Sequence, residues 1–227
     1  YAGKRIDTTA TVRQLTAQLP GLTAVIGVGK VPDTLGWEEL TAAVAPLEFA
    51  ALPFDHPVYI LYSSGTTGPP KGIVHGAGGT LLQHLKEQRL HTDLRASDRF
   101  FYYTTTGWMM WNWLASGLAS EATLVLFDGS PFHPGPAALF DLAAEEHVDI
   151  LGVSAKFLDS VRKAALRPIE THDLSRVRTI LSTGSPLVPE SFDFVYDAVA
   201  RDVQLASISG GTDIVSCFLC GDPTGAV

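Results

Sequence analysis

The stretch that decides the fold is residues 149–184, DILGVSAKFLDSVRKAALRPIETHDLSRVRTILSTG. It opens with a strand-like segment (149–154), continues with a segment of helical spacing (155–166), and ends in a second strand-like segment (177–184). Two strand-length segments joined by a helix predict a βαβ unit with parallel strands. We therefore expect a parallel sheet at the centre of the molecule.

The same alternation continues on both sides of this unit. Leu82, Leu85 and Leu90 recur near one face of the helix expected over 79–91. The pattern predicts an α/β fold, layered α/β/α with largely parallel sheets, and ligands bound at the carboxyl ends of strands. A linker is expected over 46–57. Further strands are expected over 22–29, 56–62, 98–105, 122–129 and 203–211, and further helices over 12–19, 37–45, 112–120, 135–148 and 189–200.

Composition excludes several classes of function. The formal charge is −8 and no basic patch is present, which argues against a nucleic-acid partner. The longest apolar runs are strand-sized, so no membrane span is expected. The cysteines of CFLC, Cys217 and Cys220, lack two further ligands for a structural zinc site and lie in an apolar run. We interpret them as reduced structural cysteines, in keeping with a cytoplasmic location.

The most informative loop is YSSGTTGPPKG, residues 62–72. A Walker A loop is excluded, because Pro70 stands where its second Gly belongs and Gly72 follows Lys71 without a hydroxyl. Glycines nevertheless let backbone N–H groups converge on an anion, hydroxyls add donors and Lys71 adds a positive charge. By composition alone, a loose turn and a phosphate cradle both stay open.

The order of these residues resembles the signature loop of the adenylate-forming superfamily, which includes acyl-CoA synthetases. The one departure is Ser63, which stands in a usual Thr position and keeps the hydroxyl. The resemblance implies that the loop wraps the β- and γ-phosphates of ATP. The residues implied in that role are Ser63, Ser64, Gly65, Thr66, Thr67, Gly68 and Lys71.

Two further segments resemble the superfamily in the expected order. TTTGWMMWNW (104–113) is similar to the aromatic segment that borders the acyl and CoA pockets of short-chain acyl-CoA synthetases. STGSPLVPE (182–190) is similar to the turn that contacts adenine. The resemblance implies Trp108, Met109, Met110 and Thr183 in the acyl pocket, and Gly184, Ser185 and Pro186 beside the nucleotide.

SISGGTDI (207–214) resembles the segment usually seen as Tyr-Gly-x-Thr-Glu. The resemblance implies that Thr212 bonds the α-phosphate and that Asp213, one methylene shorter than Glu, helps to hold Mg²⁺. Thr212 and Lys71 are thus the implied catalytic residues. The nucleotide site would also include Ser207, Ile208, Ser209, Gly210 and Gly211.

Within the superfamily, three of these segments, YSSGTTGPPKGIVH (62–75), TTTGWMMWNW (104–113) and SGGTDIVSCF (209–218), most resemble the synthetases that activate acetoacetate. Acetate-activating members usually have a Trp two positions before the motif Thr, where this chain has Gly210. We expect the missing indole to leave room for a longer acid. A Gly210→Trp substitution should then shift preference toward acetate.

The implied reaction uses ATP, Mg²⁺ and CoA. Carboxylate attacks the α-phosphorus and releases pyrophosphate, and the CoA thiol then displaces AMP. No Gly-x-Ser-x-Gly nucleophile motif is present, and His75 is interpreted as a packing or surface histidine rather than a base. The superfamily's ribose-binding Asp and C-terminal Lys are not found. We therefore expect residues 1–227 to be part of an N-terminal ATP- and acyl-binding domain without the C-terminal lid, inactive alone.

Two other interpretations stay open. The first is a ligase of the same superfamily for acetate, propionate or butyrate. The second is a nucleotide-binding module without catalysis of its own. The oligomeric state is not determined by the sequence.

Overall fold

The structure is a computed structural model that describes residues 1–63 and 68–225. The chain forms two compact units, one of Gly3–Ala51 with Tyr1 and one from Leu52 onward. No helix in the described residues is long and apolar enough to cross a membrane. That residues 1–227 belong to one ATP- and acyl-binding domain stays a prediction.

The first unit contains two helices and a minimal pair of strands. The helix expected over 12–19 is confirmed, but the buried strand expected over 22–29 is wrong. Only two of its residues pair with β2, and Ile26 and Val28 are 53% and 76% exposed. The reason is local: Gly29, two residues after β1, has a left-handed φ of +78° and turns the chain away from the extended conformation. The elements are α1 (Thr9–Ala17), β1 (Ile26–Gly27), β2 (Leu35–Gly36) and α2 (Trp37–Thr41).

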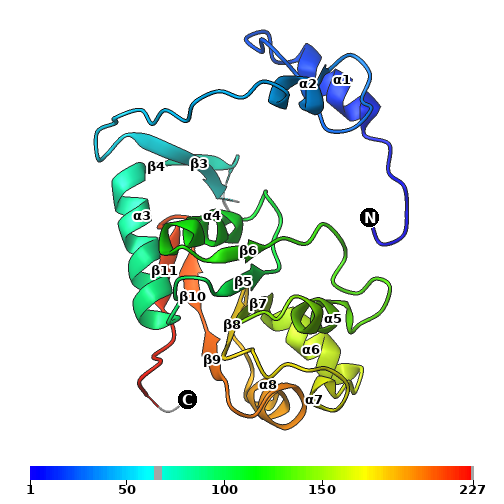
Figure 1. The fold of residues 1–227 in the computed structure, drawn as a ribbon, viewed down its shortest axis with the longest axis vertical. Helices are drawn as coiled ribbons and strands as arrows, with labels where there is room; N and C mark the ends of the chain where they lie inside the picture. The colour runs from blue at the N-terminus through cyan, green and yellow to red at the C-terminus, as the bar shows by residue number, and fades with distance from the viewer. Residues whose placement is uncertain (64–67, 226–227) are drawn as a thin grey trace. The chain divides into compact units, whose positions relative to one another are not determined.

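The centre of the second unit is a five-stranded sheet in the order β6-β5-β7-β8-β9 (Figure 1). Every neighbouring pair in it is parallel. The βαβ unit expected over 149–184 is therefore confirmed, and so is the α/β fold class. The strands are β5 (Arg99–Tyr102), β6 (Thr123–Val125), β7 (Ile150–Ser154), β8 (Thr179–Thr183) and β9 (Gln204–Ser207).

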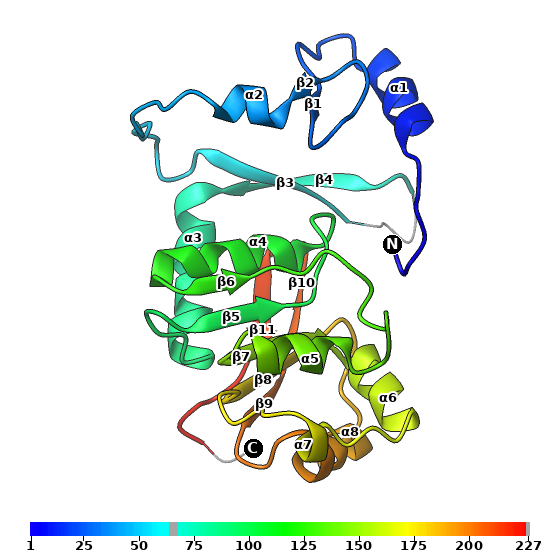
Figure 2. The same ribbon diagram turned by 45° about the vertical axis from the view of Figure 1, so that its right-hand side comes forward.

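Side chains of the central strands alternate between two apolar clusters, as the two-residue period of a strand requires. Phe101, Leu151 and Ile180 join one cluster, whereas Phe100 and Leu181 join the other. Helices cover both faces, as Figure 2 shows. On the first face lie α5 (Ala138–Glu145), α6 (Ala155–Lys163) and α8 (Pro189–Phe194) with the π-helical turn Val195–Val199; on the second lies α4 (Met109–Ala115), continued by the 3₁₀ turn Ser116–Ser120.

A separate antiparallel pair, β3 (Pro57–Ser63) and β4 (Lys71–Gly76), flanks the glycine-rich loop. Tyr59 and Leu61 pack against the second cluster. A short helix over Pro168–Thr171, α7, was not expected from the sequence. The strand expected over 203–211 is interrupted at Ile208, so β9 is followed by a separate hairpin of β10 (Ser209–Gly211) and β11 (Ser216–Leu219).

Helix α3 (Ala77–Lys86) continues into a π-helical turn, Glu87–His91, and does not bury its leucines. Leu82 and Leu90 are each 65% exposed, whereas His84 and Glu87 are almost fully buried. The expected apolar face is therefore not the buried one. The cause is the partner: this face bonds the β10–β11 hairpin, which offers backbone and hydroxyl groups.

Candidate active site

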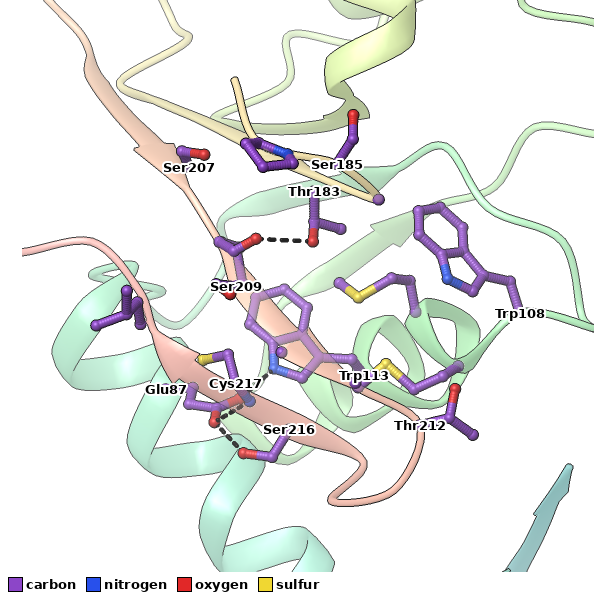
Figure 3. Close-up of a pocket in the computed structure, with 18 residues that line it drawn as sticks. Glu87, Trp108, Trp113, Thr183, Ser185, Ser207, Ser209, Thr212, Ser216 and Cys217 are labelled. Atoms are coloured by element: carbon purple, nitrogen blue, oxygen red, sulfur yellow. Dashed lines mark hydrogen bonds between the residues drawn. The ribbon is translucent and has the colours of Figure 1, made fainter. Parts of the chain in front are cut away.

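A cavity of about 440 Å³ opens beside the carboxyl ends of β8 and β9 (Figure 3). Its walls come from segments that are far apart in the chain. The predicted residues that line it are Trp108, Met109, Met110, Thr183, Gly184, Ser185, Pro186 and all of 207–212. The structure thus brings the three downstream segments to one cavity; their contacts with a ligand stay predictions.

The turn after β8 is held against the chain that follows β9. The Thr183 hydroxyl donates to the Ile208 carbonyl at 2.9 Å, and the Ile208 N–H donates to the Ser182 carbonyl at 2.7 Å. Gly184 has φ +92°, a left-handed conformation that side chains rarely adopt. Gly184 therefore lets the chain turn sharply at the strand end, where Ser185 and Pro186 line the cavity.

Glu87 lines the cavity as a buried carboxylate with four donors. Trp113 Nε1 donates to one oxygen at 2.9 Å, while Gln83, the Ser216 hydroxyl and the Cys217 N–H donate to the other. Burial alone would raise the pKa of Glu87, but these hydrogen bonds together lower it. The carboxylate is therefore ionised and holds α3, α4 and β11 together around the cavity.

Sequence reasoning missed five residues of the cavity: Glu87, Trp113, Ser216, Cys217 and Leu219. For Glu87 the signal was the polar spacing of 83, 84, 87 and 88 on one helical face, opposite the leucines; the other four had no comparable signal. Cys217 and Cys220 are free cysteines. Their mutual hydrogen bond, followed by burial, raises the pKa of the Cys217 thiol.

The two ends of the glycine-rich loop lie opposite each other in the β3–β4 pair, Ser63 beside Lys71. Because side chains alternate along a strand, Ser63 and Lys71 project from the same face of the pair as Tyr59 and Leu61. That face packs against the second apolar cluster. Lys71 is exposed and has no ion pair with any described residue. Of the predicted loop residues, Gly68 lies in a bend, and Ser64, Gly65, Thr66 and Thr67 lie outside the described residues.

Thr212 and Asp213 lie in the four-residue turn (212–215) between β10 and β11. His75 Nε2 lies 3.0 Å from the Thr212 carbonyl oxygen. Because a carbonyl only accepts, Nε2 carries the proton, which suits a structural contact rather than a base at that nitrogen. Asp213 is exposed, and the described residues hold no group of three or more potential metal ligands. One free carboxylate fits Mg²⁺, which commonly binds one or two carboxylates together with phosphate oxygens and water.

Gly210 lines the cavity, but the structure gives this glycine a second reason. A Cβ at position 210 would lie 2.1 Å from the Ser216 carbonyl oxygen and 2.6 Å from Cys217 Cα. Both atoms belong to the backbone of β11, so a larger residue would displace that strand. The Gly210→Trp substitution expected to shift preference toward acetate is therefore unsuitable, because it would disturb the hairpin itself.

Comparison with known proteins gives consistent matches. The AMP-binding enzyme family matches residues 4–226. Acetoacetyl-coenzyme A synthetase of Rhizobium meliloti (strain 1021) is 56% identical, with 98% of this chain and 36% of that protein covered. Malonamoyl-CoA synthetase vrtB of Penicillium aethiopicum is 49% identical, with 80% of this chain and 27% of that protein covered.

A solved structure agrees with these matches. Acetoacetyl-CoA synthetase from Streptomyces lividans has a TM-score of 0.93 and 47% identity, covering 99% of this chain and 36% of that one. The chain thus spans about a third of the length of such relatives. Because the family match extends over nearly every residue, the chain belongs to the AMP-binding enzyme family.

Proposed function

We propose that the chain provides the ATP- and acyl-binding part of an AMP-forming ligase that joins acetoacetate to CoA. The observation that carries this proposal is a cavity at the carboxyl ends of β8 and β9, which residues of three predicted segments line together. The identity of 56% to an acetoacetyl-coenzyme A synthetase supports it. The free cysteines fit a reducing compartment, so the proposed location is the cytoplasm.

In the first step, a carboxylate oxygen of acetoacetate attacks the α-phosphorus of ATP and the bond to pyrophosphate breaks. The residues act by positioning and by stabilising charge. Lys71, exposed and without an ion pair to any described residue, would meet the leaving pyrophosphate. Thr212 would orient the α-phosphate. Mg²⁺, held by Asp213, would offset charge on the phosphate oxygens.

In the second step, the CoA thiol attacks the acyl carbon of the adenylate, and AMP leaves with the electrons of the broken C–O bond. Residues 183–186 would hold the adenylate beside the strand end during this exchange. Trp108 borders the cavity and meets Tyr102 edge to face, with ring centroids 6.1 Å apart, and would form one wall of the proposed acyl pocket. A covalent link to the protein is not required.

Malonamate is a second candidate acid, because a malonamoyl-CoA synthetase is 49% identical to the chain. Malonamate and acetoacetate have the same skeleton, a carboxylate with a carbonyl two carbons away, and differ in an amino group against a methyl. The proposed substrate class is therefore a short acid with a 3-carbonyl group. Acetate, propionate and butyrate lack that carbonyl.

The test is ATP–pyrophosphate exchange by the gene product that carries this sequence, with acetoacetate, malonamate, acetate, propionate and butyrate compared at equal concentrations. We expect acetoacetate to give the highest kcat/KM. A preference for malonamate would keep the substrate class and change the substrate. Exchange that favours butyrate over both would overturn the class, and ATP binding without any exchange would favour a nucleotide-binding module.

A further inference from the structure

The turn over residues 212–215 has a strained backbone at its end. Val215 has φ +48°, a left-handed conformation that is a genuine outlier for a β-branched residue. Such a conformation persists only where surrounding contacts determine it. The turn contains the two residues to which the proposed function gives roles in phosphate and Mg²⁺ binding, Thr212 and Asp213. The contacts that hold it therefore bear on catalysis.

His84 holds the Val215 end of the turn. Its Nε2 lies 2.6 Å from the Val215 carbonyl oxygen and its Nδ1 lies 2.8 Å from the Ser116 hydroxyl. The carbonyl can only accept, so Nε2 carries the proton. His84 is fully buried in α3, with its ring fixed from both sides. The imidazole thereby fixes the direction of the strained carbonyl.

His75 holds the other end. Its Nε2–H donates to the Thr212 carbonyl at 3.0 Å across a sequence separation of 137 residues. His75 lies in β4, the strand that leaves the glycine-rich loop and begins at Lys71. One hydrogen bond thus joins the strand behind the predicted pyrophosphate loop to the residue predicted to contact the α-phosphate.

The two bonds leave the reactive side chains of the turn unengaged. Both imidazoles bind backbone carbonyls, at the first and last residues of the turn, and neither bonds the Thr212 hydroxyl. The carboxylate of Asp213 is exposed. Beyond the turn, Glu87 binds the hydroxyl of Ser216, so β11 is anchored independently of the histidines.

We propose that His75 and His84 are positioning residues that clamp the turn over residues 212–215, so that Thr212 keeps a fixed distance from Lys71, the first residue of β4, during adenylation. This inference rests on the proposed function and adds to it a residue pair that acts through the backbone. A consequence is that the clamp should affect the transition state more than ATP binding, because small misplacements of a catalytic group chiefly slow the chemical step.

The experiment compares three variants of the gene product that carries this sequence. His75→Phe keeps a ring and removes the donor, and His75→Gln keeps an N–H donor of similar reach. His91→Phe is the matched control, since His91 Nδ1 makes the same kind of bond, at 3.0 Å, to the Gly221 carbonyl at the far end of the hairpin. The readouts are amide hydrogen exchange over residues 209–219 and the kinetics of ATP–pyrophosphate exchange.

For His75→Phe we expect faster hydrogen exchange at the turn and a kcat lowered about 10-fold, with the KM for ATP changed less than about twofold. His75→Gln should restore most of kcat, and His91→Phe should leave both readouts near wild type. Two results would overturn the clamp. The first is unchanged amide hydrogen exchange at the turn in His75→Phe, and the second is an equal loss of kcat in the Phe and Gln variants. If the wild type shows no ligase activity while amide hydrogen exchange at the turn is still faster in His75→Phe, the proposed function fails and the clamp stands as a structural feature.

Discussion

The amino ends and the carboxyl ends of the strands in the five-stranded sheet differ in how their polar groups are paired. At the amino ends of the strands, charged groups are paired. Arg178 donates to both carboxylate oxygens of Asp98 at 3.0 and 2.5 Å, and Asp149 accepts from Arg176 at 2.7 Å. The backbone N–H of Arg99 also donates to Asp149, at 2.8 Å. These groups immediately precede strands β5, β7 and β8 or lie at their first residues.

At the carboxyl ends, the cavity is lined by hydroxyls and glycines together with the apolar side chains of Trp108, Met109, Met110, Trp113, Ile208 and Leu219. Among the described lining residues, Glu87 is the one carboxylate, and its hydrogen bonds all go to the protein. Gly184 is left-handed, and Val215, next to the lining residue Ser216, is strained. Satisfied charges stabilise a fold, whereas a strained backbone conformation is typical of a functional site. The comparison indicates that the polar groups at the amino ends of the strands stabilise the fold, whereas those at the carboxyl ends serve binding.

The largest expected effect comes from the exposed cation beside the loop. Lys71→Gln should lower the kcat/KM of ATP–pyrophosphate exchange by about 1,000-fold, because a charge that stabilises the leaving pyrophosphate is lost. Its free energy of unfolding should stay within about 0.5 kcal/mol of wild type. Lys86→Gln, at an exposed lysine of α3, is the control. If the Lys71 variant loses stability instead of activity, the binding role proposed for Lys71 is wrong.

The next largest effect is expected at the paired charges at the amino ends of the strands. Asp98→Ala should lower the free energy of unfolding by about 3 kcal/mol, because Arg178 is left partly buried without its bidentate partner. Urea denaturation measures this, and the exchange activity of the folded fraction should stay near wild type. The control is Asp202→Ala at an exposed carboxylate, expected within about 0.5 kcal/mol. A stable but inactive Asp98 variant would contradict the comparison.

A smaller effect is expected at adjacent glycines of the hairpin. Gly210→Ala should destabilise by about 2 kcal/mol, since its Cβ would overlap the Ser216 carbonyl of β11. Gly211→Ala is its matched control, because a Cβ at 211 meets nothing within 4 Å. Thermal unfolding of the two variants separates crowding from backbone freedom. Equal losses at both positions would mean that close approach of the strands does not explain Gly210.

The smallest effect is a pH dependence at the clamp. Burial, the largest cause, lowers the pKa of His84, while the bond to the Val215 carbonyl and the charge of Glu87 oppose this and His75 adds to it. The unfolded histidine has a pKa near 6.5, so below that pH the unfolded state binds a proton that the folded state does not. Stability is therefore present above about pH 6.5 and is lost as the pH falls toward the folded pKa.

The expected slope from His84 is at most about 1.4 kcal/mol per pH unit, the limit for one proton. Urea denaturation of wild type and His84→Gln between pH 8 and 5 isolates it, with His56→Gln, at an exposed histidine, as the control. The His84 variant should decline less steeply than wild type. Identical pH profiles would show that His84 is not held neutral by the fold.

The elements predictable from the sequence were those that bury apolar side chains on both faces. Residues 149–154 and 177–184 each contain a short apolar stretch, Ile150–Val153 and Ile180–Leu181, on either side of a helical segment, so their place in a parallel sheet followed from local pattern. The strand expected over 22–29 is wrong because the left-handed Gly29 turns the chain soon after Ile26–Gly27, which an apolar pattern does not reveal. Helix α3 failed differently: its buried face is polar, and only the tertiary partner of His84 and Glu87 explains that.

The candidate site was predictable in its segments but not in its supports. Trp108, Thr183 and Thr212 could be named because each lies in a recognisable short segment. Glu87 and His75 could not be named as supports of the site. Their partners, Ser216 and Thr212, each lie more than 120 residues away along the chain. Gly210 shows a third case, in which the right residue was named but for a reason that omitted the neighbouring strand.

The most direct test of the central claim is a structure of the gene product that carries this sequence, bound to a non-hydrolysable acetoacetyl-adenylate analogue. We predict that its adenine lies beside residues 184–186, its phosphate-like group lies within hydrogen-bond distance of the Thr212 hydroxyl, and its acyl chain points toward Trp108. An analogue bound away from the carboxyl ends of β8 and β9, or an adenine that does not touch residues 184–186, would contradict the account.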